Sequence, residues 1–335
     1  MVRRVAMKTL FNIFNIFCAL LLLMAKPLIA DDLNIRIFKV GQANAVLLTK
    51  DNTALVVDCG NGSRYGQSFD NGLCGQSIKR DNVLSQCDQL KIIITHDHDD
   101  HYNAINAFKG VVDKIKNIIN IISIWNEALY DSFSGYKKVG VFKHGNWQYA
   151  GWLNGADNIN GYLSGALGDD VTVTCLRPDK FEDTLLNPEK EHDNNVLLYI
   201  EYRGIGILLP GDANSTLLAY HMLHTPNFIN TLKNVNILLI PHHGSAKSGE
   251  QLWIDAIFGG VGNNKIKMLF ISSDPEEENK IPKEWLCKQL DSKKLPNFEY
   301  IGRTWRLQHC CYRISIDANG QIEVFDGKNQ LFPAQ

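Results

Sequence analysis

Residues 96–101 read His-Asp-His-Asp-Asp-His and follow the apolar run Ile92–Ile94. Imidazole and carboxylate groups are the ligands that zinc, iron and manganese accept. Donors this close in the chain cannot easily all face one ion. We therefore expect a tight loop to turn the first two histidines towards one metal, and Asp100 and His101 towards another. Two metals about 3.5–4 Å apart form the usual clamp for hydrolysing an ester or amide. A solvated polar loop is the alternative, but it gives no reason for so many ligands after a buried strand.

Three other predicted strands also end in carboxylates or histidines. The strands are residues 54–57, 205–210 and 235–240, followed by Asp58, by Asp212 and by the pair His242–His243. We expect these side chains at the same rim as the cluster at 96–101. A carboxylate at Asp212 could bridge two metals. Asp58 has two open interpretations: it orients a ligand histidine through the second ring nitrogen, or it forms a turn.

Three of the histidines that lie away from these strand ends could also bind metal. His192 precedes a predicted strand at 196–200, so a polar donor again adjoins an apolar strand, here at its beginning. His221 and His224 have i, i+3 spacing in a helix predicted over 213–224, and this spacing alone can bind metal. No carboxylate or other histidine is close to them in the chain, so we interpret both as surface residues.

The order of predicted elements occurs twice, over residues 33–125 and 171–325. In each part, strands come first and strands with helices follow, with helices expected at 82–90, 251–258 and 282–290. A repeated order of this kind predicts one α/β (α+β) domain rather than two independent ones. Its architecture is an αββα sandwich, with two facing mixed sheets and helices outside.

Residues 126–168 have no regular pattern and interleave glycines with aromatic residues. Long loops of this composition are often lids or pocket walls, and we expect a loop or lid insertion here. An insertion folded over the edge of the core is the alternative.

The first thirty of the 335 residues have the layout of a secretory signal: a basic end, a short apolar core and a small residue before Asp31. We expect cleavage rather than a retained membrane anchor, because the apolar run of residues 16–25 is short for a span of about 20 residues. The functional domain is then residues 31–335, exported to the periplasm or secreted. Residues 1–30 hold four of the 34 Lys+Arg and none of the 36 Asp+Glu, so the mature charge is −6. This charge argues against non-specific adhesion to nucleic acid.

Seven cysteines remain in residues 31–335. Export permits disulfides, and Cys74 with Cys87 is the expected pair, because it closes a polar loop. The odd number leaves at least one thiol unpaired. None of the spacings is that of a zinc finger.

The ordered motifs resemble those of the metallo-β-lactamase superfamily, and within it the hydrolase domain of ComEC-type competence proteins. The resemblance covers about residues 33–316. It is carried by the pattern His96-x-His98-x-Asp100-His101, by Val40-Gly41-Gln42, by Asn194-Asn195 before an apolar strand, by Leu208-Leu209-Pro210-Gly211-Asp212 and by Pro241-His242-His243-Gly244-Ser245. Asp58 matches the leading aspartate of the family. Ala43-Asn44 departs from the family's Gly-Asp, and the multi-span channel of the competence proteins has no counterpart.

The resemblance implies a role for each residue. It places His96, His98 and His192 on one metal, Asp100, His101 and His242 on the other, and Asp212 between them. Asn194 or Asn195 is the alternative to His192 as the third ligand. His243 contacts a leaving group or phosphate, or else supports a ligand. Asp100, Asp212 and His243 are the expected catalytic residues.

These observations predict an exported hydrolase with two divalent metal ions, with zinc expected and manganese as the alternative. Paired metals give a nucleophilic hydroxide at neutral pH and stabilise the charge that develops. The resemblance implies a phosphodiester substrate, either a nucleic-acid strand or a small phosphodiester. An acyl hydrolase acting on a β-lactam, lactone or thioester is the second interpretation. A binding module with a structural or vestigial metal site is the third.

Overall fold

The structure of the chain is a computed structural model that divides into two units, Met1–Asp31 and Asp32–Gln335. All described residues belong to the second unit. The predicted signal segment 1–30 and the predicted lid, except residues 163–168, lie outside them. The described residues are 32–62, 78–79, 83–84, 87–96, 98–105, 107–108, 120–124 (backbone only), 163–176, 192, 195–245, 266–273, 286, 288, 299–307, 310–327 and 329–332.

Eight strands form the first sheet, in the order β14-β13-β12-β1-β2-β3-β4-β5. The strands are β1 (Leu33–Phe38), β2 (Ala45–Lys50), β3 (Thr53–Cys59), β4 (Gln89–Ile93), β5 (Asn120–Ile124), β12 (Cys311–Ile316), β13 (Ile322–Asp326) and β14 (Asn329–Phe332). Every residue of β3 is buried, as expected for an apolar strand in the centre of a sheet that is covered on both faces.

Parallel pairing in this sheet brings the two polar segments together. Strands β3 and β4 run parallel, with Val57 opposite Ile93. Asp58, near the end of β3, and Thr95, just after β4, therefore lie at the same edge of the sheet. The next short helix, α3 (Asp99–Tyr102), carries two of the predicted ligands at that edge.

Six strands form the second sheet, in the order β11-β10-β9-β8-β7-β6. The strands are β6 (Val171–Leu176), β7 (Leu197–Tyr202), β8 (Ile205–Leu209), β9 (Val235–Leu239), β10 (Met268–Ile271) and β11 (Tyr300–Arg303). Strands β8 to β11 are all parallel, so their carboxyl ends share one edge. The segments after β8 and β9 contain Asp212 and the pair His242–His243.

The two sheets face each other across one apolar core. Buried side chains from both sheets belong to a single cluster, in which Leu48 and Val57 of the first sheet join Leu198 and Phe270 of the second. This packing confirms the predicted architecture of two facing mixed sheets.

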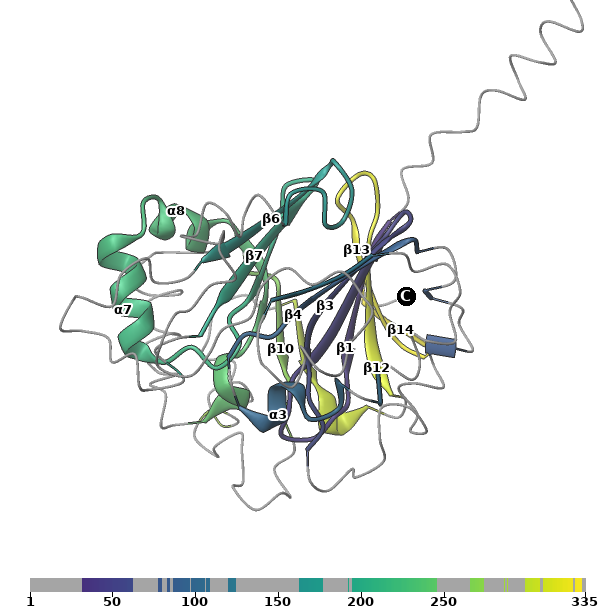
Figure 1. Cartoon of the computed structure of the whole chain (residues 1–335), viewed down its shortest axis with the longest axis horizontal. Helices are drawn as coiled ribbons and strands as arrows, with labels where there is room; N and C mark the ends of the chain where they lie inside the picture. Colours follow the sequence, from purple (N-terminus) through teal and green to yellow (C-terminus); the bar gives the residue numbers. More distant parts are fainter. Residues whose placement is uncertain are drawn as a thin grey trace, which may run out of the picture. The chain divides into compact units, whose positions relative to one another are not determined.

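Two helices cover the outer face of the second sheet: α7 (Ser215–His224) and α8 (Phe228–Lys233). Figure 1 shows them beside β6 and β7. A second apolar cluster forms this layer, in which Leu217 of α7 and Leu232 of α8 pack with Leu208 and Leu238 of the sheet. Helix α7 begins at Ser215 because the Asn214 side chain caps it by accepting a hydrogen bond from the Leu217 N–H, at 2.8 Å. This helical layer therefore packs against β8 and β9, the strands that precede Asp212 and the histidine pair.

Several elements differ from the prediction. The helix expected at 82–90 is not formed in its described part, because the chain enters strand β4 at Gln89 to pair with Thr53. The short strands β11 and β14 and the short helices α3 and α8 were not predicted. The helix expected at 251–258 lies outside the described residues. No helix in the described ranges is long and apolar enough to cross a bilayer.

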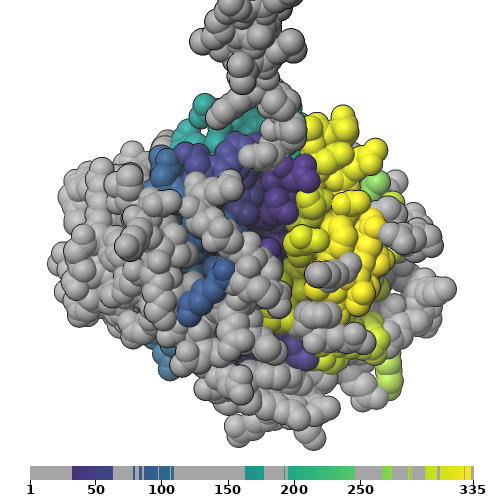
Figure 2. Space-filling model, turned by 90° about the vertical axis from the view of Figure 1, so that its right-hand side faces the viewer, coloured from purple at the N-terminus to yellow at the C-terminus, as the bar shows by residue number. Residues whose placement is uncertain are grey.

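The C-terminal strands return to the first sheet. Strand β12 pairs with β1, with Phe38 opposite Cys311, and β13 and β14 extend the sheet outwards. Figure 2 shows these strands in yellow next to the N-terminal strands in purple. Sequence order alone placed residues 311–325 with the second half of the chain, so this long-range pairing corrects the expected division.

Candidate metal centre

The structure brings together seven side chains in two adjoining groups at the shared edge of the two sheets. In each group, the possible ligand atoms lie within 4.8 Å of one another. The first group is His96, His98, His192 and Asp212, and the second is Asp100, His101, Asp212 and His243. Asp212 is common to both, as a bridging ligand would be.

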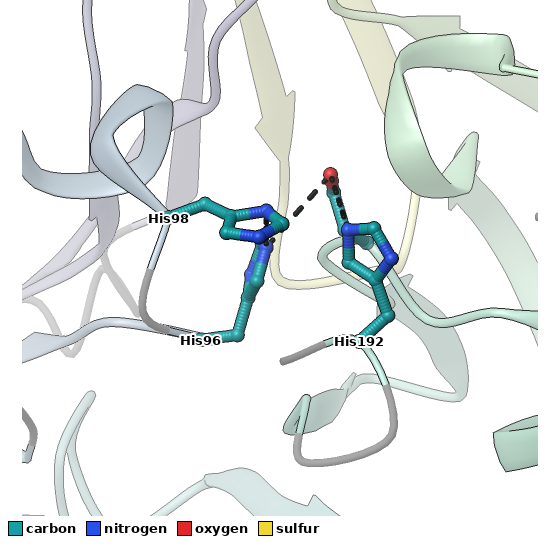
Figure 3. A group of neighbouring side chains, drawn as sticks. His96, His98 and His192 are labelled. Atoms are coloured by element: carbon teal, nitrogen blue, oxygen red, sulfur yellow. Dashed lines mark hydrogen bonds and ion pairs between the residues drawn. The ribbon is translucent and has the colours of Figure 1, made fainter. Parts of the chain in front are cut away.

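The first group joins three separate loops. Figure 3 shows the imidazole rings of His96, His98 and His192 turned towards one another. His96 Nε2 lies 2.9 Å from His98 Nδ1, and the His192 ring centroid lies 4.7 Å from that of His98. Asp212 Oδ2 lies 3.9 Å from His96 Nε2 and 4.0 Å from His192 Nε2. Three imidazoles and one carboxylate are a suitable ligand set for zinc.

The second group is more deeply buried. His101 Nε2 lies 3.1 Å from Asp212 Oδ1, and His243 Nε2 lies 3.3 Å from Asp100 Oδ2 and 3.6 Å from Asp212 Oδ1. His101, Asp212 and His243 are each at most 2% exposed, whereas the Asp100 side chain is 35% exposed. Solvent therefore reaches this group on the side of Asp100.

Asp58 fixes the orientation of the His101 ring through the ring nitrogen Nδ1, which points away from the ligand group. The His101 Nδ1–H donates to Asp58 Oδ2 at 2.7 Å, and the same carboxylate accepts hydrogen bonds from the Thr95 N–H at 2.7 Å and the Thr95 hydroxyl at 2.9 Å. The structure thus gives Asp58 the contact that an orienting residue needs, with Nε2 of the ring facing Asp212. Asp58 has φ +59°, a left-handed conformation that aspartate tolerates better than most residues.

Asn195 fixes the backbone that carries Asp212. Its side-chain oxygen accepts a hydrogen bond from the Asp212 N–H at 2.9 Å, and its amide donates to Pro210 O at 2.6 Å and Val196 O at 3.0 Å. Both ends of its amide are therefore engaged by the backbone, so Asn195 does not take the place of His192. A Cβ atom on Gly211, which has φ +56°, would overlap the Asn195 side chain. Asn194 lies outside the described residues.

The order of the last two histidines differs from the expectation. The turn Pro241–Gly244 holds both His242 (φ +49°) and His243 (φ +55°) in left-handed conformations. The two rings therefore diverge, and His243 points inwards to Asp100 and Asp212. His242 is 15% exposed, with Nε2 3.6 Å from Asp212 Oδ2 and its ring 4.5 Å from that of His192. His243 thus occupies the position expected for His242, and His242 lies towards the rim.

The electrostatics of the second group favour a positive charge. Burial opposes protonation of His101, but the charges of Asp58 and Asp212 raise its pKa well above the usual value. Burial likewise opposes a raised pKa for His243, and Asp212 and Asp100 outweigh it. Burial favours the neutral form of Asp212, yet the same histidines hold its pKa well below the usual value. The carboxylates are therefore charged and need a cation beside them.

His96 and His242 favour the neutral form, which is the form that binds metal. Burial lowers the pKa of His96 well below the usual value, and the neighbouring His101 lowers it further. Burial lowers the pKa of His242 to about 4, against a smaller opposing effect of Asp212. These rings stay available as nitrogen ligands at neutral pH.

The hydrogen bonds of the second group fit a metal ion. His101 and His243 donate through Nδ1 to Asp58 and to Ser272 O, so in the neutral rings Nε2 carries a lone pair. Each lone pair faces a carboxylate oxygen. His101 Nε2, His243 Nε2 and Asp212 Oδ1 have no hydrogen-bond partner among the described residues, although all three are buried. A cation is needed between such acceptors: either the two ring protons that the raised pKa values of His101 and His243 indicate, or a divalent metal ion that displaces these protons and contacts all three atoms at once.

Sequence reasoning missed two residues and misjudged a third. Thr95 and Ser272 contact the carboxylate and the imidazole that they support, and both directly follow apolar strands. That position was the available signal, but it does not tell which hydroxyl or backbone carbonyl lies next to a ligand in the folded chain. His221 was expected at the surface, whereas it is fully buried against Phe228 with Nδ1 2.7 Å from Thr225 Oγ1. His224 is exposed, as expected.

No cysteine among the described residues belongs to either group. Cys59, Cys87, Cys175, Cys310 and Cys311 are buried and form no disulfide. The disulfide expected between Cys74 and Cys87 is therefore not formed at Cys87; Cys74 lies outside the described residues.

The chain is similar to one family model and to solved structures. Residues 38–173 match the family model of the metallo-beta-lactamase superfamily. Among solved structures, the metallo-beta-lactamase fold protein YhfI from Bacillus subtilis is similar at 13% identity over 84% of this chain and 99% of that chain, with a TM-score of 0.46. Unliganded yeast PDE1 is similar at 13% identity over 82% of this chain and 97% of that chain, with a TM-score of 0.43. No curated protein matches the chain.

Proposed function

We propose that the chain, of which residues 38–173 match the model of the metallo-β-lactamase superfamily, is an exported hydrolase of phosphodiester bonds with two divalent metal ions. The observation that carries this proposal is the shared Asp212, around which two groups of ligands meet. Two ions held by one carboxylate supply a hydroxide nucleophile at neutral pH and a positive field for the attacking and leaving oxygens of a displacement. Zinc is the proposed metal, and manganese is the alternative.

The charge of the ligand set favours an anionic substrate. Five of the seven side chains are imidazoles, and only Asp100 and Asp212 carry negative charge. Two divalent ions therefore exceed the charge of their carboxylate ligands by about two, when the imidazoles are neutral. A phosphodiester carries one negative charge and gains more in its transition state, so this excess stabilises it.

Each residue has a defined task in this proposal. His96, His98 and His192 hold the first ion, and His101, His243 and Asp100 hold the second. Asp58 keeps the His101 ring in place. His242 is exposed enough at the rim to contact a bound phosphate, a role that the sequence suggested for His243.

The substrate class and the export rest on the sequence. The phrases around Asp212 and His242 resemble those of ComEC-type hydrolase domains, which supports a nucleic-acid strand or a small phosphodiester as substrate. The basic and apolar pattern of residues 1–30 supports export to the periplasm or secretion.

Hydrolysis of two chromogenic substrates tests the proposal. We expect the zinc- or manganese-loaded protein to cleave bis-p-nitrophenyl phosphate, and an Asp212→Asn variant to lose this activity by about 1,000-fold or more. Glu323→Gln, which alters an exposed carboxylate on β13, is the matched control and should keep full activity. Cleavage of nitrocefin without cleavage of the phosphodiester would establish the acyl hydrolase instead. No turnover of either substrate would favour a binding module.

A further inference from the structure

Ser272 closes a ring of contacts that links the two sheets at the second group of ligands. It follows strand β10 and is 1% exposed. Its carbonyl accepts a hydrogen bond from the His243 Nδ1–H at 2.8 Å, and its hydroxyl donates to Ala43 O at 2.6 Å. Ala43 precedes β2 of the first sheet, so one serine connects His243 with the opposite sheet.

The chain of contacts continues from Ala43 through Asn44 to Asp100. The N–H of Asn44, next to Ala43, donates to the backbone carbonyl of Asp100 at 3.3 Å. The Asp100 carboxylate then lies 3.3 Å from His243 Nε2, which returns to the starting residue. Asp100 follows a strand of the first sheet and His243 follows a strand of the second. A closed chain of contacts through Ser272 therefore fixes the distance between these two side chains.

The residue after Ser272 is held by the segment that follows the adjoining strand β11. The Ser273 N–H donates to Thr304 Oγ1 at 3.0 Å, and the Thr304 hydroxyl donates back to Ser273 O at 3.2 Å. Thr304 follows β11, so three parallel strands of the second sheet, β9, β10 and β11, fix the position of the carbonyl that His243 uses.

From this geometry we infer that Ser272 is a positioning residue for the second metal ion. This inference rests on the proposed function. The Ser272 carbonyl keeps the His243 proton on Nδ1, which leaves Nε2 as the ligand atom. The Ser272 hydroxyl sets the distance of His243 from the ligands of the first sheet. Loss of the hydroxyl should therefore weaken the second ion and leave the first ion in place.

Isothermal titration calorimetry of the metal-free chain with zinc tests this inference. The measurement compares wild type with the variants Ser272→Ala and Ser272→Cys. We expect wild type to bind two equivalents. Ser272→Ala should bind the second equivalent about 10- to 100-fold more weakly and the first with unchanged affinity. Ser272→Cys should fall between them, because a thiol is a weaker donor of the same shape. Ser315→Ala removes a similar hydroxyl contact, to Asp32 at 2.9 Å, from β12 and should match wild type.

The outcomes separate this inference from the proposed function. Two equivalents of equal affinity in wild type and Ser272→Ala would overturn the positioning role alone. No zinc binding by wild type would overturn the proposed function. Equal weakening of both equivalents, with a lowered melting temperature of the metal-free variant, would show a general packing role and also overturn the inference. If Ser272→Ala does not fold, Ser272→Cys decides between these outcomes.

Discussion

At the residue scale, the geometry of the second ligand group depends on the residues that hydrogen-bond to its histidines as well as on the ligands themselves. Asp58 and Ser272 accept the Nδ1 protons of His101 and His243, and each thereby presents the other ring nitrogen to the ion. The sequence suggested the support by Asp58 as one of two interpretations but did not assign Ser272, because hydrogen bonds between residues far apart in the chain depend on the folded structure.

Replacing Asp58 with asparagine tests the support of His101. Asparagine tolerates the positive φ of this position, and its side-chain oxygen can still accept the hydrogen bond from the Thr95 N–H. The amide nitrogen then faces His101, and it cannot accept the proton of His101 Nδ1. We expect a 10- to 100-fold loss of zinc affinity, measured by competition with a chromogenic chelator. Unchanged affinity would show that the second interpretation, a turn-forming aspartate, is sufficient.

The histidine pair offers a direct test of which ring lies inside. We expect His243→Ala to lose one of two zinc equivalents after dialysis, because His243 belongs to the second group. His242→Ala should keep both, because His242 lies at the rim. The opposite result would restore the order that the family resemblance implied.

At the element scale, helix α3 is positioned by a close approach of backbone. A Cβ atom on Gly60 would overlap the backbone oxygen of Asp100, so the glycine is what allows α3 to lie against the end of β3. The role of Gly60 is visible only once the helix and strand are in place.

Gly60→Ala should therefore displace α3 together with Asp100 and His101. We expect a loss of about 2–4 kcal/mol of unfolding free energy and of the second zinc equivalent. Chemical denaturation and zinc titration measure these two losses. The control is Gly204→Asn, at a position with open space and a φ of +75° that asparagine accepts. A Gly60→Ala variant with wild-type stability would contradict the close approach.

Helix α7 contains a histidine that should make the protein sensitive to acid. Burial lowers the pKa of His221 from 6.5 to about 4, so the folded protein keeps it neutral while the unfolded chain protonates it. Its contribution is complete above pH 6.5 and is lost progressively as the pH falls towards 4, by up to about 3 kcal/mol.

Denaturant melts between pH 7 and 4 check this contribution. His221→Asn removes the titration and keeps an acceptor for Thr225, so its stability should fall less steeply with acid than that of wild type. His224→Asn, at the exposed end of the same helix, should match wild type. Parallel curves for His221→Asn and wild type would contradict the buried neutral state.

At the scale of the whole molecule, the two sheets meet at the metal centre. The first sheet provides the cluster after β4, and the second provides Asp212 and His243. The fold class could be predicted because apolar strands and their polar ends are local patterns. The return of β12–β14 to the first sheet could not, since pairing across more than 270 residues leaves no local signature.

Metal content measured by elemental mass spectrometry tests the central claim most directly. We expect about two equivalents of zinc or manganese in the purified chain and a loss of both in Asp212→Ala, because Asp212 is the one side chain that both groups share. The Glu323→Gln control should keep both equivalents. A chain that holds no metal, even after incubation with zinc and manganese, would contradict the account of a two-metal hydrolase.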